Sequence, residues 1–224
     1  MTYDLTPLLL SLKLATVTTV ILFAVGVPLA YWLSRSRSWF RLPVQVLVTM
    51  PLVLPPTVLG FYLLLGLSPA SFLGHLFLKY LHLRLVFSFT GIAIGSVIFS
   101  LPFMVNSVLA GFEGLPPSLA EASQVLGKTE RQTLFHVLLP NIKPALFTGL
   151  ALTFAHTMGE FGVVLMIGGK IPGVTRVASM AIYDEVEAMN YSAAHLYAGI
   201  LFTVSFAFLL LLFFVNRRFY RGIQ

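Results

Sequence analysis

Two ionisable side chains, His156 and Glu160, stand within an otherwise apolar stretch of the sequence. Their spacing of four residues would place both on one face of a helix, where they could relay a proton or hold a metal ion. Two ligands do not make a metal site, and no third ligand is evident in the sequence. We therefore expect a structural hydrogen bond between His156 and Glu160, and no metal.

A second candidate for chemistry is the string LGKT at residues 126–129, which looks like the end of a phosphate-binding loop. That motif needs a glycine five positions before its second glycine, and position 122 holds alanine instead. No buried strand precedes the string, and no nucleophile stands with a base at a workable spacing. We expect that the chain is not an enzyme and binds no cofactor of its own.

Polar residues gather at the centre of the sequence, in EASQVLGKTERQTLFHVLLP at residues 121–140. Ser118 and Thr129 are each followed three residues later by Glu or Gln, which is the spacing of a capping box at the start of a helix. Gly127 stands where a helix would end in a left-handed cap. The segment is predicted to form two short helices with a glycine corner, and Pro140 is expected to close the second.

Each of these two short helices has an apolar side that must be covered. The apolar residues are Leu119, Ala122, Val125 and Leu126 in the first helix, and Leu134, Phe135 and Leu138 in the second. They could pack on the rest of the chain, or part of them could fit a groove in a partner protein. Spacing alone favours packing within the chain.

The composition sets the environment of the chain. Hydrophobic residues make up 58% of its 224 residues and charged residues only 10%, which is too apolar for an ordinary soluble domain. The sequence contains no cysteine, so it has no disulfide framework and no cysteine-ligated metal. We expect an all-α integral membrane protein that contacts lipid.

Uncharged apolar runs of about 20 residues, the length that crosses a hydrocarbon core of ~30 Å, predict the transmembrane helices. We expect about five spans in a single domain over residues 1–224, with a cytoplasmic helix-turn-helix loop at residues 117–140. The predicted spans are residues 8–33, 44–67, 85–112, 142–168 and 196–215.

Basic residues indicate the orientation of these spans, because cytoplasmic connections are enriched in Lys and Arg. Nine of the fourteen Lys and Arg residues fall in alternate connections: Arg35, Arg37, Arg41, Lys128, Arg131, Lys143, Arg217, Arg218 and Arg221. The polar segment and the C-terminus should therefore be cytoplasmic and the N-terminus outside. The net charge of +6 is a topology signal on this interpretation, and no nucleic acid partner is expected.

Some residues of the spans could line or gate a path through the membrane. Pro55 and Pro56, with Pro51, must break or kink the second span, and such breaks are tolerated where protein or a water-lined cavity satisfies the backbone. Thr57, Asn106 and Ser107 are candidate neutral path liners. A simple kink at a packing contact would explain the prolines equally well.

Glu160 has three interpretations: a residue of the path or its gate, a structural hydrogen-bond acceptor, or a residue near the outer interface. It lies 20 residues beyond Pro140, which is roughly 30 Å along a continuous helix. A carboxylate at mid-bilayer costs at least ~2.5 kcal/mol and is a poor ligand for an anion. We expect a structural or gating residue.

The polar segment resembles the EAA loop of ABC importer permeases, whose pattern is EAA, three residues, G, nine residues, I, one residue, LP. Ser replaces the third residue of the pattern and Val replaces Ile. In that family the loop forms the coupling helices that seat in a cytoplasmic ATP-binding subunit, which uses the ATP, and transmit its closure to the spans. The matching positions hold Glu121, Ala122, Ser123, Gly127, Val137, Leu139 and Pro140.

Three further segments resemble molybdate permeases, with sulfate and tungstate permeases as close relatives. They are PLVLPPTVLG, GEFGVVLMIGGKIPGVTR and AIYDEVEAMNY. The resemblance implies a permease subunit of a bacterial or archaeal cytoplasmic (inner) membrane that imports molybdate or a similar tetrahedral oxyanion. It also implies an extracytoplasmic substrate-binding protein and a second permease chain, in a homodimer.

One departure from the family pattern concerns the candidate path. His156 in AHTMGEFG stands where an Arg is expected in a phrase resembling ARSLGEFG, which puts any role of that Arg in anion passage in doubt. The main alternative from another class is a passive channel or a proton-coupled transporter, in which His156 and Glu160 would relay protons.

Overall fold

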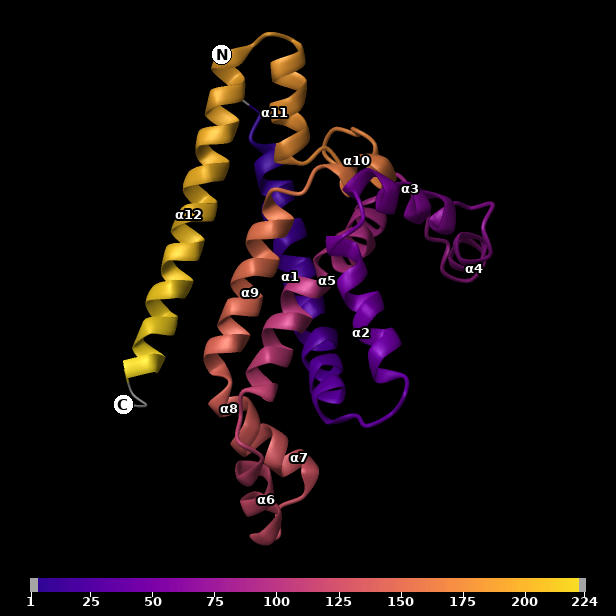
Figure 1. Ribbon diagram of the computed structural model, residues 1–224. Helices are drawn as coiled ribbons and strands as arrows, with labels where there is room; N and C mark the ends of the chain where they lie inside the picture. Colours follow the sequence, from indigo (N-terminus) through magenta and orange to yellow (C-terminus); the bar gives the residue numbers. More distant parts are fainter. Residues whose placement is uncertain (1–3, 222–224) are drawn as a thin grey trace.

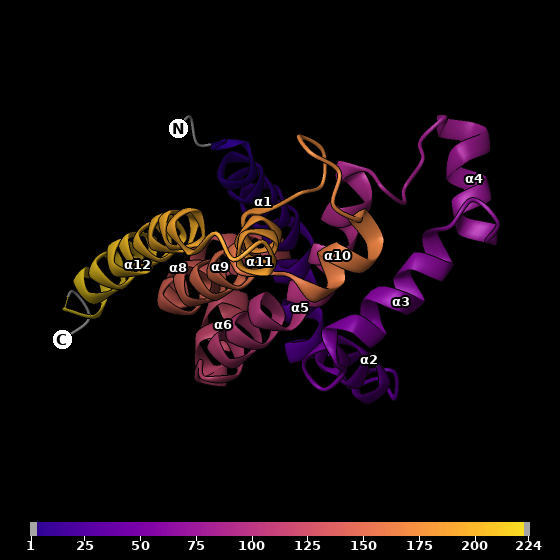
Figure 2. The ribbon, with the colours of Figure 1, turned by 90° about the horizontal axis from the view of Figure 1, so that it is seen from above.

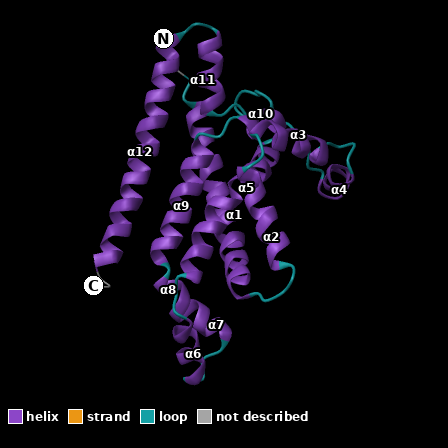
Figure 3. Ribbon diagram, viewed as in Figure 1, coloured by secondary structure: helices purple, strands orange, loops and turns teal. Residues whose placement is uncertain are grey.

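The computed structural model describes the backbone of residues 4–221 and the side chains of residues 4–214. Throughout this range the chain forms helices and connecting loops, without a strand (Figure 3). The expectation of an all-α membrane protein is confirmed. Two breaks in the helices, described below, give the fold its particular shape.

Three helices form the centre of the molecule: α1 (Thr6–Arg35), α5 (Phe89–Glu113) and α9 (Lys143–Met158) (Figure 1). Helices α1 and α5 run parallel and approach closely, since a Cβ on Gly26 would lie 2.9 Å from Met104 Cγ. Helix α9 runs antiparallel to α5, with Thr157 and Ser100 hydroxyls 3.0 Å apart near one end and Ala145 beside Gly111 near the other. The buried core lies mainly between these three helices.

The remaining helices lie on two sides of this centre. Helix α12 (Tyr191–Arg221) packs on α9 and on α11 (Ala178–Glu187). On the other side are α2 (Arg41–Thr49), the 3₁₀ helix η1 (Met50–Leu52), α3 (Pro56–Leu67) and α4 (Phe72–Leu81). Seen from above, α12 and α4 lie at opposite ends of an elongated molecule (Figure 2). Helix α12 on one side, and α2, η1, α3 and α4 on the other, carry many exposed apolar side chains.

Three helices are long and apolar enough to cross a membrane by themselves: Thr6–Arg35, Phe89–Glu113 and Tyr191–Phe214. Two bent pairs bring the number to five if each counts as one span. The pair Arg41–Leu52 and Pro56–Leu67 bends by 114°, and the break falls at the prolines as the sequence predicts. Helix α4 was not predicted; it forms within the connection between the second and third apolar runs.

The prediction of one helix over residues 142–168 is wrong. Helix α9 ends at Met158, because Gly159 follows it at the C-cap, and a separate helix α10 (Gly162–Gly168) begins three residues later. The distance argument for Glu160, which assumed a continuous helix, therefore fails. Glu160 lies in the break itself.

Four short elements form a hairpin that projects from one end of the molecule (Figure 1). They are α6 (Pro117–Val125), α7 (Glu130–Thr133), the π-helical turn η2 (Leu134–Leu138) and α8 (Leu139–Asn141). This end also carries the end of α12, whereas α10 and α11 lie toward the opposite end. We call these elements the hairpin, and its end of the molecule the hairpin end.

Close packing of α3 on α10 leads to a testable prediction about glycines. A Cβ on Gly60 would lie 2.8 Å from Met166 Cβ and 3.1 Å from the Val163 backbone, whereas a Cβ on Gly66 would meet nothing within 4 Å. We expect Gly60→Ala to destabilise the protein by about 1–3 kcal/mol through overpacking. Gly66→Ala in the same helix should stabilise it by about 0.5–1 kcal/mol. Thermal unfolding of the detergent-solubilised variants measures both, and equal effects of the two substitutions would contradict the close packing.

Candidate functional site

The hairpin turns at Gly127 through a defined C-terminal cap. The Lys128 amide donates to the Ser123 carbonyl at 3.1 Å and the Gly127 amide to the Gln124 carbonyl at 2.9 Å, which is the Schellman arrangement. Gly127 has a φ of +76°, in the left-handed region that glycine adopts at no steric cost. The predicted glycine corner is confirmed.

The second half of the hairpin begins as predicted, with a capping box at Thr129. The Gln132 amide donates to Thr129 Oγ1 at 3.3 Å, and the Thr129 amide donates to Gln132 Oε1 at 2.9 Å. The corresponding prediction for Ser118 is wrong: α6 begins one residue earlier, at Pro117, and has no side-chain cap. A proline at the first position lacks the N–H that a cap would satisfy, and its fixed φ suits a helix start.

The second half of the hairpin ends one residue beyond Pro140, at Asn141, and α9 begins at Lys143 with Pro144 in its first turn. The helical path continues through Pro140 to Asn141, because the preceding turn is a π-helix in which the Leu139 amide donates to the Leu134 carbonyl. A wide turn at this point accommodates a residue that has no amide to donate. The chain then bends by 74° into α9.

One side of the hairpin is buried and holds its two halves together. Ser123 Oγ lies 2.9 Å from Thr133 Oγ1, and both side chains are buried. Ala120 and Leu138 are also buried, and they join the core cluster that contains Phe112 at the end of α5. The hairpin is therefore anchored on the central bundle by one side only.

The other side of the hairpin exposes apolar side chains. Val125 is 87% exposed, Leu126 77% and Phe135 63%. Glu121 and Ala122 are exposed beside them, while Val137 and Leu139 are half-buried at the root of the hairpin. The expectation that the apolar faces pack within the chain therefore holds for Leu138, but not for Val125, Leu126 and Phe135. An exposed apolar group of this kind is suited to contact with another protein or with a membrane.

A second candidate site lies in the break between α9 and α10. Glu160 is 4% exposed, and no described residue donates a hydrogen bond to either oxygen of its carboxyl group. The Ser96 hydroxyl of α5 lies beside that carboxyl group, but the two do not have the geometry of a hydrogen bond. On α1, the buried Thr18 hydroxyl is likewise without a partner among the described residues.

Thr18 and Ser96 lie at one level of the bundle. Helices α1 and α5 are parallel, Gly26 faces Met104, and the two hydroxyl residues each precede that contact by eight residues. Glu160 lies at about the same level. Thr157 of α9 contacts Ser100 of α5, and the two helices run in opposite directions. Glu160, three residues after Thr157, is therefore level with Ser96, four residues before Ser100. Three buried polar groups from three elements thus lie at about the same level of the bundle, where the helix is broken.

His156 does not pair with Glu160, so the expected hydrogen bond between them is wrong. His156 Nδ1 lies 2.9 Å from Ser100 Oγ, and its ring packs against Phe99 and Phe103, with centroid distances of 4.7 and 4.2 Å. The break after Met158 removes the helical register on which that prediction depended. In the described structure these two groups do not form a proton relay.

The break in the second span meets the break after α9. A Cβ on Gly162, the first residue of α10, would lie 2.8 Å from Pro56 Cβ and 3.6 Å from the Thr57 amide. Pro55, Pro56 and Thr57 are exposed on the outer side of this contact. The structure thus brings two of the candidate path segments together, and glycine at position 162 allows the close approach.

Asn106 and Ser107 lie apart from this region. They are half-buried, and their positions ten or eleven residues beyond Ser96 place them about 15 Å farther along α5. The Ser107 hydroxyl donates to the Phe103 carbonyl of its own helix at 2.7 Å. These two residues do not join the polar groups at the level of Glu160.

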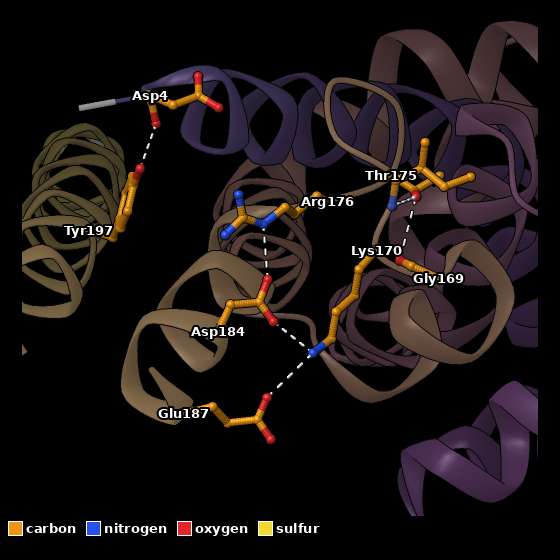
Figure 4. A network of polar contacts seen from close by, with 9 residues as sticks. Asp4, Gly169, Lys170, Thr175, Arg176, Asp184, Glu187 and Tyr197 are labelled. Carbon is orange, nitrogen blue, oxygen red and sulfur yellow. Dashed lines mark hydrogen bonds and ion pairs between the residues drawn. The ribbon is translucent and has the colours of Figure 1, made fainter. Parts of the chain in front are cut away.

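A network of charged residues joins α11 to the loop that precedes it (Figure 4). Helix α11 lies toward the end of the molecule opposite the hairpin (Figure 1). Lys170 Nζ lies 2.6 Å from one oxygen of Asp184 and 3.8 Å from Glu187, and Arg176 Nε lies 3.0 Å from the other oxygen of Asp184. The hydrogen bond to Asp184 raises the pKa of the Lys170 amine, which keeps it charged. These contacts fasten the loop between α10 and α11 onto α11, and give this end a fixed, charged surface.

Comparison with known proteins identifies the family. Residues 24–221 match the sequence model of the family described as "Binding-protein-dependent transport system inner membrane component". The chain belongs to this family. The molybdenum transport system permease protein ModB of Azotobacter vinelandii is 45% identical over 223 residues, which cover 99% of this chain and 98% of that protein. The permease is also similar to the sulfate transport system permease protein CysT of Salmonella typhimurium, with 36% identity over 85% of this chain and 68% of that protein.

A solved structure supports the fold of this permease. The bacterial ABC transporter involved in the import of the acidic polysaccharide alginate contains a chain that superposes with a TM-score of 0.79. The match covers 96% of the permease and 79% of that chain, at 20% sequence identity. The ABC importer permease fold is therefore confirmed, and the predicted membership of the molybdate permease group is supported by the relatives.

Sequence reasoning missed the residues that hold the two sites in place. Ala120 and Thr133 help to anchor the hairpin, yet neither stands at a motif position or in the apolar faces predicted for it, whereas Leu138 does belong to a predicted apolar face. Thr18 and Ser96 lie in uniformly apolar helices, where a hydroxyl carries little signal. Contacts between helices are needed to find most of these residues. The pairing of Ser123 with Thr133 is the exception, because Ser123 stands where the family pattern has Ala, and a hydroxyl there calls for a partner.

The Ser123–Thr133 contact predicts a specific non-additive effect. We expect Ser123→Ala to lower the free energy of unfolding by about 1–3 kcal/mol, because the Thr133 hydroxyl stays buried without a partner. The double variant Ser123→Ala, Thr133→Val should recover most of that loss, since both polar groups are gone. Thermal unfolding of the single and double variants measures the coupling, and additive losses would show that the contact contributes nothing.

Proposed function

We propose that this chain is the permease subunit of an ATP-driven importer that moves molybdate, or a similar tetrahedral oxyanion, across the inner membrane. Full-length similarity to a protein named for molybdenum transport supports the substrate class. Sulfate and tungstate are the alternatives, and the lower identity and partial coverage of the sulfate permease make sulfate the weaker one.

The single observation that carries the coupling role is the two-sided hairpin. One side anchors on α5 through Ala120 and Leu138, and the other presents Val125, Leu126 and Phe135 outward. An element built in this way passes a displacement of its exposed side to the bundle, because its buried side is fixed there. We propose that the exposed side seats in a cytoplasmic ATP-binding subunit, with Glu121, Ala122 and Gly127 shaping the contact.

The remaining partners follow from the two ends of the molecule. With the hairpin end cytoplasmic, the N-terminus is outside and the C-terminus inside. The charged end around Asp184 then faces outward, where a substrate-binding protein would dock on it. We further propose a homodimer, in which two permease chains surround one path and the outward-facing apolar sides of the bundle meet the second chain or lipid.

Within the path, we propose that Glu160 acts at a gate. Its carboxyl group is buried at a helix break, and it shares its level with the unpaired hydroxyls of Ser96 and Thr18. A buried carboxyl group without a hydrogen-bond partner destabilises the conformation that buries it. A second conformation that gives the group a partner or water would be favoured in comparison. A group of this kind biases a switch between two states and does not bind an oxyanion.

The first experiment tests the hairpin as a docking surface. Replacing Val125 and Phe135 together by Ser should abolish co-purification of the ATP-binding subunit and reduce ATP-driven molybdate uptake at least tenfold, because the exposed apolar contacts are lost. Both side chains are exposed, so thermal stability should be unchanged. Phe72→Ser serves as the matched control, since Phe72 is 81% exposed on α4, away from the hairpin.

Normal uptake and normal co-purification in the double variant would contradict the docking role. Uptake that survives ATP depletion at constant membrane potential would instead favour a channel or a proton-coupled transporter. Competition of labelled molybdate with unlabelled sulfate and tungstate, in the same vesicles, ranks the three oxyanions.

The second experiment tests Glu160. Glu160→Gln keeps the shape of the side chain and removes its charge, so the folded state and the complex should persist. We expect ATP-driven uptake to fall at least tenfold, because the bias between the two states of the gate is lost. Asp4→Asn, which removes an exposed carboxylate just before α1, should leave uptake unchanged. Full uptake by Glu160→Gln would show that the carboxyl group is only a packing element.

A further inference from the structure

A cavity of about 300 Å³ lies at the root of the hairpin, beside its anchored side and away from its exposed apolar residues. The end of α1, the start of α2, the end of α5 and the start of α6 all contribute to its wall. Two cations, one carboxylate and an apolar floor face into it, and we call it the arginine pocket. Its defining residues are Arg35, Arg41, Glu113, Phe112, Pro117 and Leu138.

The two arginines of the pocket are available to a ligand. No described carboxylate pairs with Arg35, which is exposed at the last turn of α1. Arg41 lies 2.6 Å from Glu113, but these side chains are 39% and 45% exposed, and exposed ion pairs contribute only about 0–1 kcal/mol. An anion of higher charge density could therefore share Arg41 with Glu113 or take it over. Guanidinium groups suit this exchange, because they bind phosphate-type oxyanions through two parallel hydrogen bonds.

The pocket lies at the end of α1, a helix long and apolar enough to cross a membrane, which would place the pocket near lipid headgroups. Trp39 and Phe40, in the loop between Arg35 and Arg41, are 85% and 67% exposed. Exposed aromatic side chains at the end of a transmembrane helix are typical of the interface between hydrocarbon and water. Basic pockets between helices at this depth are suited to anionic lipid headgroups.

We propose that the arginine pocket binds a phosphate-type oxyanion, held by Arg35 and Arg41 over the apolar floor. The same chemistry has two sources, the headgroup of an anionic phospholipid and a free tetrahedral oxyanion in solution. Because the wall includes Pro117 of α6 and Leu138 of η2, the bound anion contacts both the bundle and the hairpin. The simpler explanation, in which the arginines only orient the protein in the membrane, predicts no site-specific binding.

The tryptophans provide a local readout for a binding experiment. The chain has two, Trp32 and Trp39, and they flank Arg35 in the sequence. The full chain, purified in mild detergent, is titrated with phosphatidylglycerol and, separately, with inorganic phosphate and molybdate, while tryptophan fluorescence is followed. Phosphatidylcholine has the same phosphodiester but no net charge, and serves as the lipid control.

Three variants separate the pocket from general charge. Arg35→Gln should weaken binding about tenfold, since it removes a charge-assisted hydrogen bond. Arg37→Gln, two residues farther along and outside the pocket wall, should change binding less than about twofold. Glu113→Gln should tighten binding severalfold, because it frees Arg41 and removes the repelling carboxylate. Misfolding cannot explain opposite changes in affinity in Arg35→Gln and Glu113→Gln, because a misfolded variant would only lose binding.

The outcomes decide both the site and its source. Weaker binding in Arg35→Gln and tighter binding in Glu113→Gln, with little change in Arg37→Gln, supports the proposal. If only phosphatidylglycerol gives these effects, the pocket is a lipid site. If phosphate or molybdate gives them, it is a site for a free anion. Equal losses in Arg35→Gln and Arg37→Gln, or weaker binding in Glu113→Gln, would overturn it. Binding that disappears when the ATP-binding subunit is added would also overturn it, because the pocket would then belong to the subunit interface.

Discussion

The fold depends on satisfying backbone groups where helices break inside an apolar environment. No water is available there to replace a lost helical hydrogen bond, so the protein must supply the partner. Ser179 Oγ donates to the Glu160 carbonyl at 2.6 Å, and Thr175 Oγ1 donates to the Gly168 carbonyl at 2.7 Å at the other end of α10. The Phe87 amide donates to the Ile167 carbonyl at 2.9 Å. Side chains and loops from elsewhere in the chain thus keep this short helix in place.

The same break is where buried polar groups are left without partners. Native proteins pair almost all such groups, and the exceptions call for an explanation. The backbone at Glu160 is satisfied, whereas its carboxyl group and the hydroxyls of Ser96 and Thr18 are not. The protein therefore fastens the chain at this point but leaves the side chains in an unfavourable setting. That contrast is typical of an element with a second arrangement, and it is why we place the gate here.

How far the sequence predicts the structure depends on whether the signal is local. The capping box at Thr129, the glycine corner at Gly127 and the proline break are local, and the structure confirms them. The capping box expected at Ser118 is just as local, but it does not form because the helix begins at Pro117. The break at Gly159 is not, because an apolar run that contains glycines also suits a continuous helix, and the close contact of Gly162 with Pro56 joins distant parts of the chain. The same holds for His156, whose partner Ser100 lies 56 residues away on another helix.

The two sides of the hairpin place different demands on its sequence, and the role proposed for it depends on both. Its buried side requires small or apolar residues such as Ala120 and Leu138, and its motif glycine sets the angle between the halves. The exposed apolar residues contribute nothing to the stability of the isolated chain, since they contact little of it. A free energy gain from burying them is available only when a partner covers them. Because the hairpin is held at its root by the bundle, that gain can be transmitted to the helices that meet at Glu160.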